Sequence, residues 1–147
     1  MPETTATAEK ILIAREYVAR VFNEHRPDLS LEYVTPDVVW HGGSLGTVTG
    51  AENVRDLLRA FIGALPDLHA VEQDVIASGD LVVLRLAITA TQQGDLLGMP
   101  ATQRRVQWEA VDIYRVNEQG KIGEEWAFDD LATVASELGA IKLPWAP

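Results

Sequence analysis

The chain has 147 residues, the length of one domain with a single core, and we expect one domain over residues 1–147. Its 22 acidic against 12 basic residues give a formal charge of −10, which opposes binding to nucleic acid or to an anionic membrane surface. The absence of cysteine excludes disulfides and thiolate metal sites. No signal peptide and no apolar run long enough for a membrane span are recognisable, so we expect a cytoplasmic protein.

The first half of the chain is mainly helical in its pattern. Residues 7–25 and 51–65 repeat apolar side chains at helical spacing, and Pro66 ends the second of these segments. Residues 29–34 favour a short helix, and residues 38–40 favour a short strand. The segment HGGSLGTVTG that follows is interpreted as a mobile glycine-rich loop and a candidate lid, because its glycines do not match a phosphate-binding pattern.

The second half is rich in β-branched and aromatic residues and predicts antiparallel strands, which cover residues 69–77, 81–92, 106–116 and 121–128. A last helix over residues 130–138 begins with acids that suit its N-terminus. Helices followed by strands indicate the α+β class, with the helices packed on the concave face of a curved, mostly antiparallel sheet.

Asp112 is the main candidate for acid or base chemistry. Alternation along residues 106–116 places it on one strand face with Trp108, Ala110 and Tyr114, where an unpartnered charge is costly. Burial there would raise the pKa of its carboxyl and make it a proton acceptor or donor. The alternative is a structural carboxylate, paired with Arg85 or with a backbone amide.

Three more residues are catalytic candidates. Arg85, a charge within VVLRLAI, would hold a substrate oxygen, although it could instead pair with Asp112 or lie on the outer face of the sheet. His41 would shuttle a proton, or is a solvated loop histidine. Asp130 is assigned as a helix cap, whereas Asp129 is left as a possible cavity acid.

The remaining polar and aromatic residues are assigned more simply. Glu124 and Glu125 are interpreted as solvated strand residues, and the scattered histidines have no metal-ligand spacing, so no metal site is expected. Flat apolar walls suit an aromatic ligand, and the expected substrate-binding residues are Trp40, Trp108, Tyr114, Trp126, Phe61 and Gln92.

Several segments carry a family resemblance, namely EYVTPDVVWH, PDLHAVEQDVIASGDLVVLRLAITAT, QQGDLLGMPATQRRV and YRVNEQGKIGEEW. Together they resemble the SnoaL-like polyketide cyclases of the nuclear transport factor two superfamily. The resemblance implies a cone-shaped α+β barrel and, for the cyclases, a ring-closing aldol condensation without metal or organic cofactor. It also implies an acid/base Asp at the position of Ala127 and a His at the position of Asp112.

Because Ala127 replaces the acid implied by the resemblance, hydroxylation of an aromatic, anthracycline-type polyketide is the favoured prediction. A separate reductase is a possible partner, and no bound cofactor is expected. Two alternatives stay open: cyclisation or isomerisation with Asp112 as the base, and non-catalytic binding of a small molecule. A homodimer is expected, because Val111 and Ile113 would leave the outer face of the sheet partly apolar.

Overall fold

The computed structural model describes residues 2–146, which form an α+β domain of helices packed on one sheet. Its helical segments are α1 (Pro2–Tyr17), η1 (Val18–Asn23), η2 (Pro27–Glu32), η3 (Gly43–Leu45), α2 (Ala51–Ala64) and α3 (Leu131–Glu137). Its strands are β1 (Val34–His41), β2 (Thr47–Thr49), β3 (His69–Ser78), β4 (Leu81–Thr91), β5 (Arg105–Val116) and β6 (Ile122–Asp129). Among these residues, no helix combines the length and the apolar character needed to cross a membrane.

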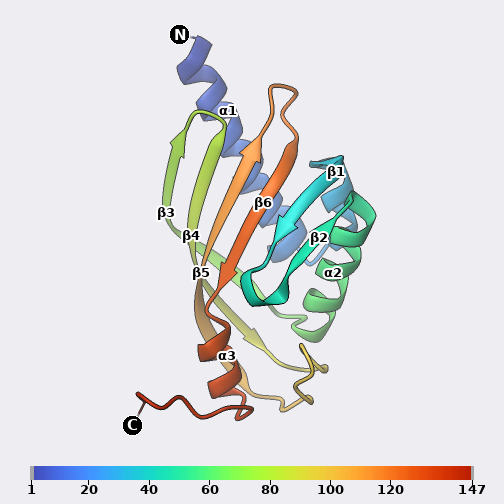
Figure 1. The fold of residues 1–147 in the computed structure, drawn as a ribbon, viewed down its shortest axis with the longest axis vertical. Coiled ribbons are helices and arrows are strands. Elements are labelled where there is room, and N and C mark those ends of the chain that lie inside the picture. Colours follow the sequence, from blue (N-terminus) through green and yellow to red (C-terminus); the bar gives the residue numbers. More distant parts are fainter. Residues whose placement is uncertain (1, 147) are drawn as a thin grey trace.

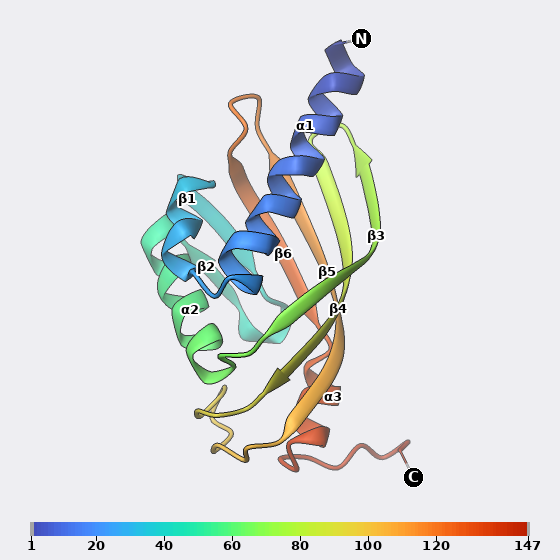
Figure 2. The same cartoon turned by 180° about the vertical axis from the view of Figure 1, so that it is seen from behind.

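The six strands form a single open sheet in the order β2-β1-β6-β5-β4-β3. Every neighbouring pair is antiparallel except β1 and β6, which run parallel. The long strands β3 to β6 twist and curve along their length, and α3 lies at one end of β5 and β6 (Figure 1). Seen from behind, α1 crosses the concave face of the sheet while α2 lies beside β1 and β2 (Figure 2). The helices therefore cover the concave face of the sheet (Figure 2).

The N-terminal helix buries the face that the sequence pattern predicts. Ala14, Tyr17, Val18 and Val21 are buried at spacings of three and four residues. Past Tyr17 the helix widens into the π-helical segment η1, which was not expected from the sequence. The Asn23 amide then bridges the backbone of Ala70, accepting from its N–H at 2.7 Å and donating to its carbonyl at 2.9 Å. This bridge fixes η1 against the start of β3.

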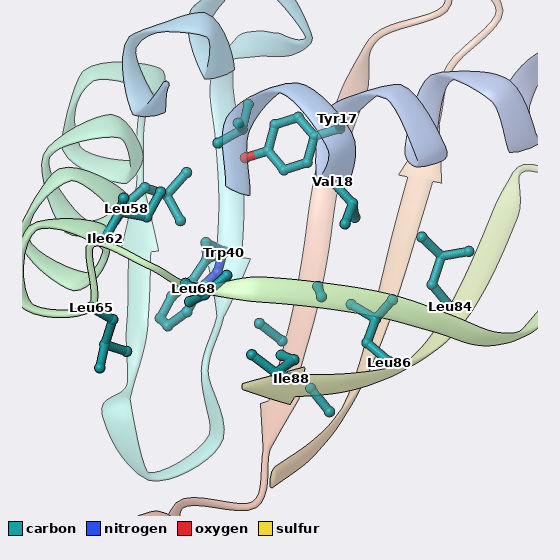
Figure 3. Close-up of a cluster of buried hydrophobic side chains, with 14 of the residues drawn as sticks. Tyr17, Val18, Trp40, Leu58, Ile62, Leu65, Leu68, Leu84, Leu86 and Ile88 are labelled. Atoms are coloured by element: carbon teal, nitrogen blue, oxygen red, sulfur yellow. The ribbon is translucent and has the colours of Figure 1, made fainter. Parts of the chain in front are cut away.

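The core lies between α2 and the concave face of the sheet. Alternate residues of β4 point inward, so that Leu84, Leu86 and Ile88 face the buried side of the helices (Figure 3). Trp40 on β1 lies between these β4 side chains and α2, from which Leu58 and Ile62 extend toward it (Figure 3). The Trp40 ring also lies close to the backbone of Gly42, where an added Cβ atom would be 2.2 Å from the ring.

The glycine-rich segment after β1 differs from expectation. The glycine-rich stretch HGGSLGTVTG was interpreted as a mobile loop, but it forms the short helix η3 and the edge strand β2, which pairs with β1. The backbone N–H of Gly42 donates to the Gly46 carbonyl at 2.9 Å, which closes the turn. The pairing of β2 with β1 is not visible in the sequence, because the strand over residues 47–49 is short and is flanked by glycine.

Replacing Leu84 by Ala tests the core assignment. Leu84 is 1% exposed at the centre of β4, so truncation leaves a cavity and should lower the free energy of unfolding by about 2–5 kcal/mol in urea denaturation. The matched control is Ile76→Ala, since Ile76 is 64% exposed and should tolerate the change with a loss below about 1 kcal/mol. Equal losses in both variants would contradict the packing described here.

Candidate active site

A cavity of about 130 Å³ lies between α2, η1 and the inward face of the sheet. Its walls are mostly apolar, and they include Val18, Phe22, Trp40, Leu58, Phe61, Leu68, Leu86 and Ile88. The exposed residues Asp95 and Leu97, from the segment between β4 and β5, mark its mouth. An apolar cavity of about 150 Å³ is large enough to bind benzene, so this space is large enough to take about one aromatic ring of a ligand whose other parts extend through the mouth.

Three carboxyl groups project into this apolar space, from Asp112, Glu125 and Asp129. Their positions follow from the register of β5 and β6, in which Tyr114 pairs with Glu125, Asp112 with Ala127, and Ala110 with Asp129. Asp112 is therefore the diagonal neighbour of both other acids on the same face of the sheet. Ala127, the small residue directly opposite Asp112, also lines the cavity. No Lys, Arg or His of the described residues lines this cavity.

The three carboxyls differ in their hydrogen bonds. The indole N–H of Trp108 donates to Asp129 Oδ1 at 2.8 Å, and the hydroxyl of Tyr114 donates to Asp112 Oδ2 at 3.1 Å. The Glu125 carboxyl has no hydrogen bond or ion pair within residues 2–146. A donor stabilises the ionised form of a carboxyl, so Asp129 and Asp112 are better prepared to carry a negative charge than Glu125.

Burial makes the charged forms of all three groups unfavourable. Desolvation, followed by repulsion from Asp129, raises the pKa of Asp112 from 3.8 to about 8. Desolvation and repulsion from the two aspartates raise the pKa of Glu125 well above its ordinary value. The pKa of Asp129 is also raised by burial, and the Trp108 N–H opposes that rise. The cluster therefore holds protons near neutral pH and can both accept and donate them.

Of the residues expected to form a site, four line the cavity: Asp112, Asp129, Trp40 and Phe61. Two more support them from behind. Trp108 packs edge-on against Phe61 with ring centroids 6.4 Å apart and holds Asp129, while Tyr114 is buried and holds Asp112. Trp108 and Tyr114 thus position the acids and are not among the lining residues.

Three expected site residues face the other side of the sheet, which corrects their placement. Arg85 is exposed there and pairs with Asp74 at 2.7 Å and Glu109 at 2.9 Å. His41 bonds Glu124 at 2.8 Å, and its ring stacks on Trp126 at 5.3 Å. Strand alternation explains these positions. Leu84 and Leu86, on either side of Arg85, point inward, and so does Trp40, which precedes His41. Arg85 and His41 therefore cannot reach a substrate in the cavity, and Trp126 is not one of its walls.

Gln92, expected to contact substrate, has a structural position instead. Its side chain is fully buried, donates to the Met99 carbonyl at 2.9 Å, and accepts from the Thr102 hydroxyl at 2.7 Å and the Thr102 N–H at 3.1 Å. These bonds engage both the oxygen and the nitrogen of its side-chain amide. Gln92 therefore anchors the segment that carries Asp95 and Leu97 to the cavity mouth.

Glu125 was interpreted as a solvated residue, and this is wrong, because it is 2% exposed and lines the cavity. The pattern held a signal that could have found it. Residues two apart on a strand share a face, so the assignment of Ala127 to the cavity also implied Glu125 and Asp129. Asp130 behaves as predicted, since its carboxylate accepts from Thr133 N at 3.1 Å and caps α3.

The protein has an open, curved sheet covered by helices, with an apolar cavity between them and carboxyls that face into it. An apolar cavity with a few inward polar groups is typical of a small-molecule site in an α+β protein. Comparison with known proteins identifies the family. The sequence pattern of the SnoaL-like polyketide cyclases matches residues 12–138, so the chain belongs to that family. The fold class, and the family expected from the sequence, are confirmed.

Two curated relatives and two solved structures illustrate the similarity. Aklanonic acid methyl ester cyclase DnrD of Streptomyces peucetius is 31% identical over 118 residues, which cover 80% of this chain and 77% of DnrD. DauD of Streptomyces sp. (strain C5), with the same described activity, is 31% identical over 78% of this chain and 67% of its own. AclR of Streptomyces galilaeus, a candidate hydroxylase, superposes with a TM-score of 0.81 at 28% identity, over 92% of this chain and 99% of AclR. A SnoaL-like protein of Jannaschia sp. CCS1 has a TM-score of 0.85 at 22% identity, over 92% of this chain and 95% of its own, and shows the fold.

The carboxyl cluster should make stability depend on pH. Between pH 3.8 and about 8, folded Asp112 holds a proton that the unfolded chain has lost. The stability from this proton is complete at low pH and is lost as pH rises through the folded pKa. We expect the free energy of unfolding to fall between about pH 5 and about pH 8, by up to about 1.4 kcal/mol per pH unit for each such proton.

Asp112→Asn removes one titrating group and should flatten this slope in urea denaturation across the same pH range. Glu109→Gln, an exposed acid on the outer face, is the matched control and should keep the wild-type slope. If Asp112→Asn and wild type lost stability in parallel, Asp112 would not hold its proton in the folded protein.

Proposed function

We propose that the protein abstracts a proton from an enolisable carbon of an aromatic polyketide in the cavity and so closes a ring by intramolecular aldol condensation. The observation that carries this proposal is the group of three inward carboxyls in an apolar cavity, where burial raises the pKa of Asp129 as well as that of Asp112 above the ordinary value. A general base works best when its pKa lies near the operating pH. The similarity to two aklanonic acid methyl ester cyclases supports the same reaction class.

The proposed reaction is balanced without an added redox partner. A carboxylate of the Asp112–Asp129 pair takes the proton from the carbon next to a carbonyl, and the C–H electron pair moves onto the carbonyl oxygen. The enolate carbon then attacks a ketone carbon of the same molecule, which forms the new C–C bond and leaves an alkoxide. The alkoxide takes a proton back from the pair, so that the product is an isomer of the substrate and the carboxylate is regenerated.

Asp129 is the better initial base of the two. The Trp108 indole N–H stabilises its ionised form at 2.8 Å, and it is the least enclosed of the three acids. Asp112 then holds a proton beside it, because two close carboxyls do not ionise together readily. Ala127 leaves space directly over Asp112, where a reacting carbon can lie between the two groups.

Hydroxylation is the second candidate, favoured by the similarity in fold and sequence to AclR. It was preferred from the sequence because Ala127 replaces the acid implied by the family resemblance, but three neighbouring carboxyls weaken that reason. The first step could be the same proton removal. The stoichiometry then differs. Molecular oxygen supplies one of its atoms to the substrate carbon, and a reductant must supply two electrons to reduce the other oxygen atom to water. A reductase partner is needed only in this case.

The test is product analysis by liquid chromatography, which separates isomers, coupled to mass spectrometry, with a panel of aromatic polyketide methyl esters incubated with and without oxygen and a reductant. We expect an isomeric product under anaerobic conditions. A product one oxygen heavier, formed only with oxygen, would support hydroxylation in its place. Quenching of tryptophan fluorescence without any product would favour a binding protein.

Substitution of the two aspartates should identify the base. Asp129→Asn and Asp112→Asn each remove a proton acceptor while keeping the size of the side chain, so each should lower kcat by about 100-fold or more. The control is Asp74→Asn, a carboxylate on the outer face with 57% of its side chain exposed, which should turn over like wild type. Full activity in both cavity variants would contradict a base role for the pair.

A further inference from the structure

Glu125 is the polar group in the cavity that the proposed reaction leaves without a task. It is 2% exposed, and its strand β6 directs it to the same face as Ala127 and Asp129. Its partner across the ladder is Tyr114, two residues from Asp112, so it is the diagonal neighbour of Asp112 on this face of the sheet. Any substrate that reaches Asp112 in this cavity therefore also lies beside the Glu125 carboxyl.

The surroundings of Glu125 disfavour its ionised form. No N–H, hydroxyl or cation of residues 2–146 donates to its carboxyl, in contrast to Asp129 and Asp112. A buried carboxylate without a donor or a counter-ion is one of the most costly groups in a protein interior. Glu125 avoids this cost by keeping its proton.

The titratable groups that face Glu125 are all acids. Asp112 and Tyr114 lie on β5, Asp129 lies on β6, and Tyr17 comes from α1. Negative charge on either aspartate raises the pKa of Glu125 further, and Glu125 in turn raises the pKa of both tyrosines. When Asp129 or Asp112 becomes ionised to act as a base, the neutral form of Glu125 is therefore favoured even more.

A neutral carboxyl has one O–H to donate, and the Glu125 group has no acceptor within the described chain. We propose that Glu125 is a catalytic acid in its neutral form, which donates this O–H to the carbonyl oxygen of the substrate as that oxygen becomes an enolate. The inference rests on the proposed function and adds the group that stabilises the developing negative charge. One cluster of three similar side chains then supplies both base and oxyanion donor, because their hydrogen bonds differ.

The buried hydroxyl of Tyr17 is close enough to Glu125 and Asp112 for their charges to act on it, although Tyr17 is not among the residues that line the cavity. It has no hydrogen-bond partner, and its ring lies edge-on to Tyr114 with centroids 5.7 Å apart. The raised pKa of Tyr17, caused by burial and then by Glu125 and Asp112, keeps it a donor. Tyr17 therefore does not occupy the Glu125 carboxyl, and the Glu125 O–H is the donor that faces the cavity, which favours an enolisable ketone or a phenol as ligand.

Two substitutions separate a neutral donor from a base. Glu125→Gln keeps an uncharged N–H donor of similar size, whereas Glu125→Leu removes the donor and keeps the volume. We expect kcat of the Gln variant within about tenfold of wild type, and that of the Leu variant lower by about 100-fold or more, as for the loss of an oxyanion donor. A Gln variant as inactive as the Leu variant would overturn the proposal, and so would a fully active Leu variant.

A binding experiment keeps the inference testable even if the proposed reaction is wrong. Phenols with para substituents of increasing electron withdrawal fit the size of the cavity. At one fixed pH of about 8, a larger fraction of the more acidic phenols is ionised, and a phenolate oxygen is a stronger acceptor than a neutral phenol oxygen. Isothermal titration should show tighter binding of the more acidic phenols to wild type and to Glu125→Gln, and no such trend with Glu125→Leu. The same dependence in all three proteins, or none in wild type, would remove Glu125 as a donor to oxygen.

Discussion

Three carboxyl groups between β5 and β6 are kept out of water, and the arrangement of the rest of the domain follows from this constraint. Burying one ionised carboxylate without compensation costs several kcal/mol. Two responses are visible here. Trp108 and Tyr114 donate to the aspartates at 2.8 and 3.1 Å, and the raised pKa values mean that protons remain where donors are missing. The apolar side chains of α2, η1 and β4 provide the low-dielectric wall that makes the second response effective.

The same constraint explains why the loss of one acid does not remove the acid/base potential of the cavity. Ala127 stands where the family resemblance implies the acid, and acids flank it on both sides of the same strand face, at Glu125 and Asp129. A small residue at this place also opens space over Asp112. The chemistry is thus proposed to depend on a group of carboxyls with unequal donors, and to need no cation beside the substrate.

Much of the fold could be predicted from the sequence, because the long segments have clear periods. The limits of α2, β3, β4 and β5 agree with the expected segments to within one residue at each end. The edge strand β2 and the π-helical segment η1 could not be predicted, since both depend on pairing and packing with distant residues. The site was predicted less well. Strand alternation pointed to Asp112, whereas Asp129 was left open only as one of two adjacent acids, and the alternation rule, applied to Arg85 and His41, would have placed them outside.

Glu125 shows most clearly what sequence reasoning missed. An adjacent Glu pair, at 124 and 125, looks like a solvated strand, and only one of the two is solvated. Glu124 bonds His41 and Arg115 on the outer face, whereas Glu125 faces the cavity. Choosing between them requires knowing which face of β6 is buried, and the cavity position implied for Ala127 would have given this by alternation.

The most direct test of this account is the titration of the cavity carboxyls by carbon-13 NMR. Protein with labelled Asp and Glu side chains would be followed from about pH 4 to about pH 9, with Asp112→Asn, Glu125→Gln and Asp129→Asn used to assign the signals. The account predicts carboxyl signals that titrate far above the ordinary values of 3.8 and 4.5, with Glu125 the last to lose its proton. If all three groups were ionised by about pH 5, the central claim of a proton-holding cluster would be contradicted.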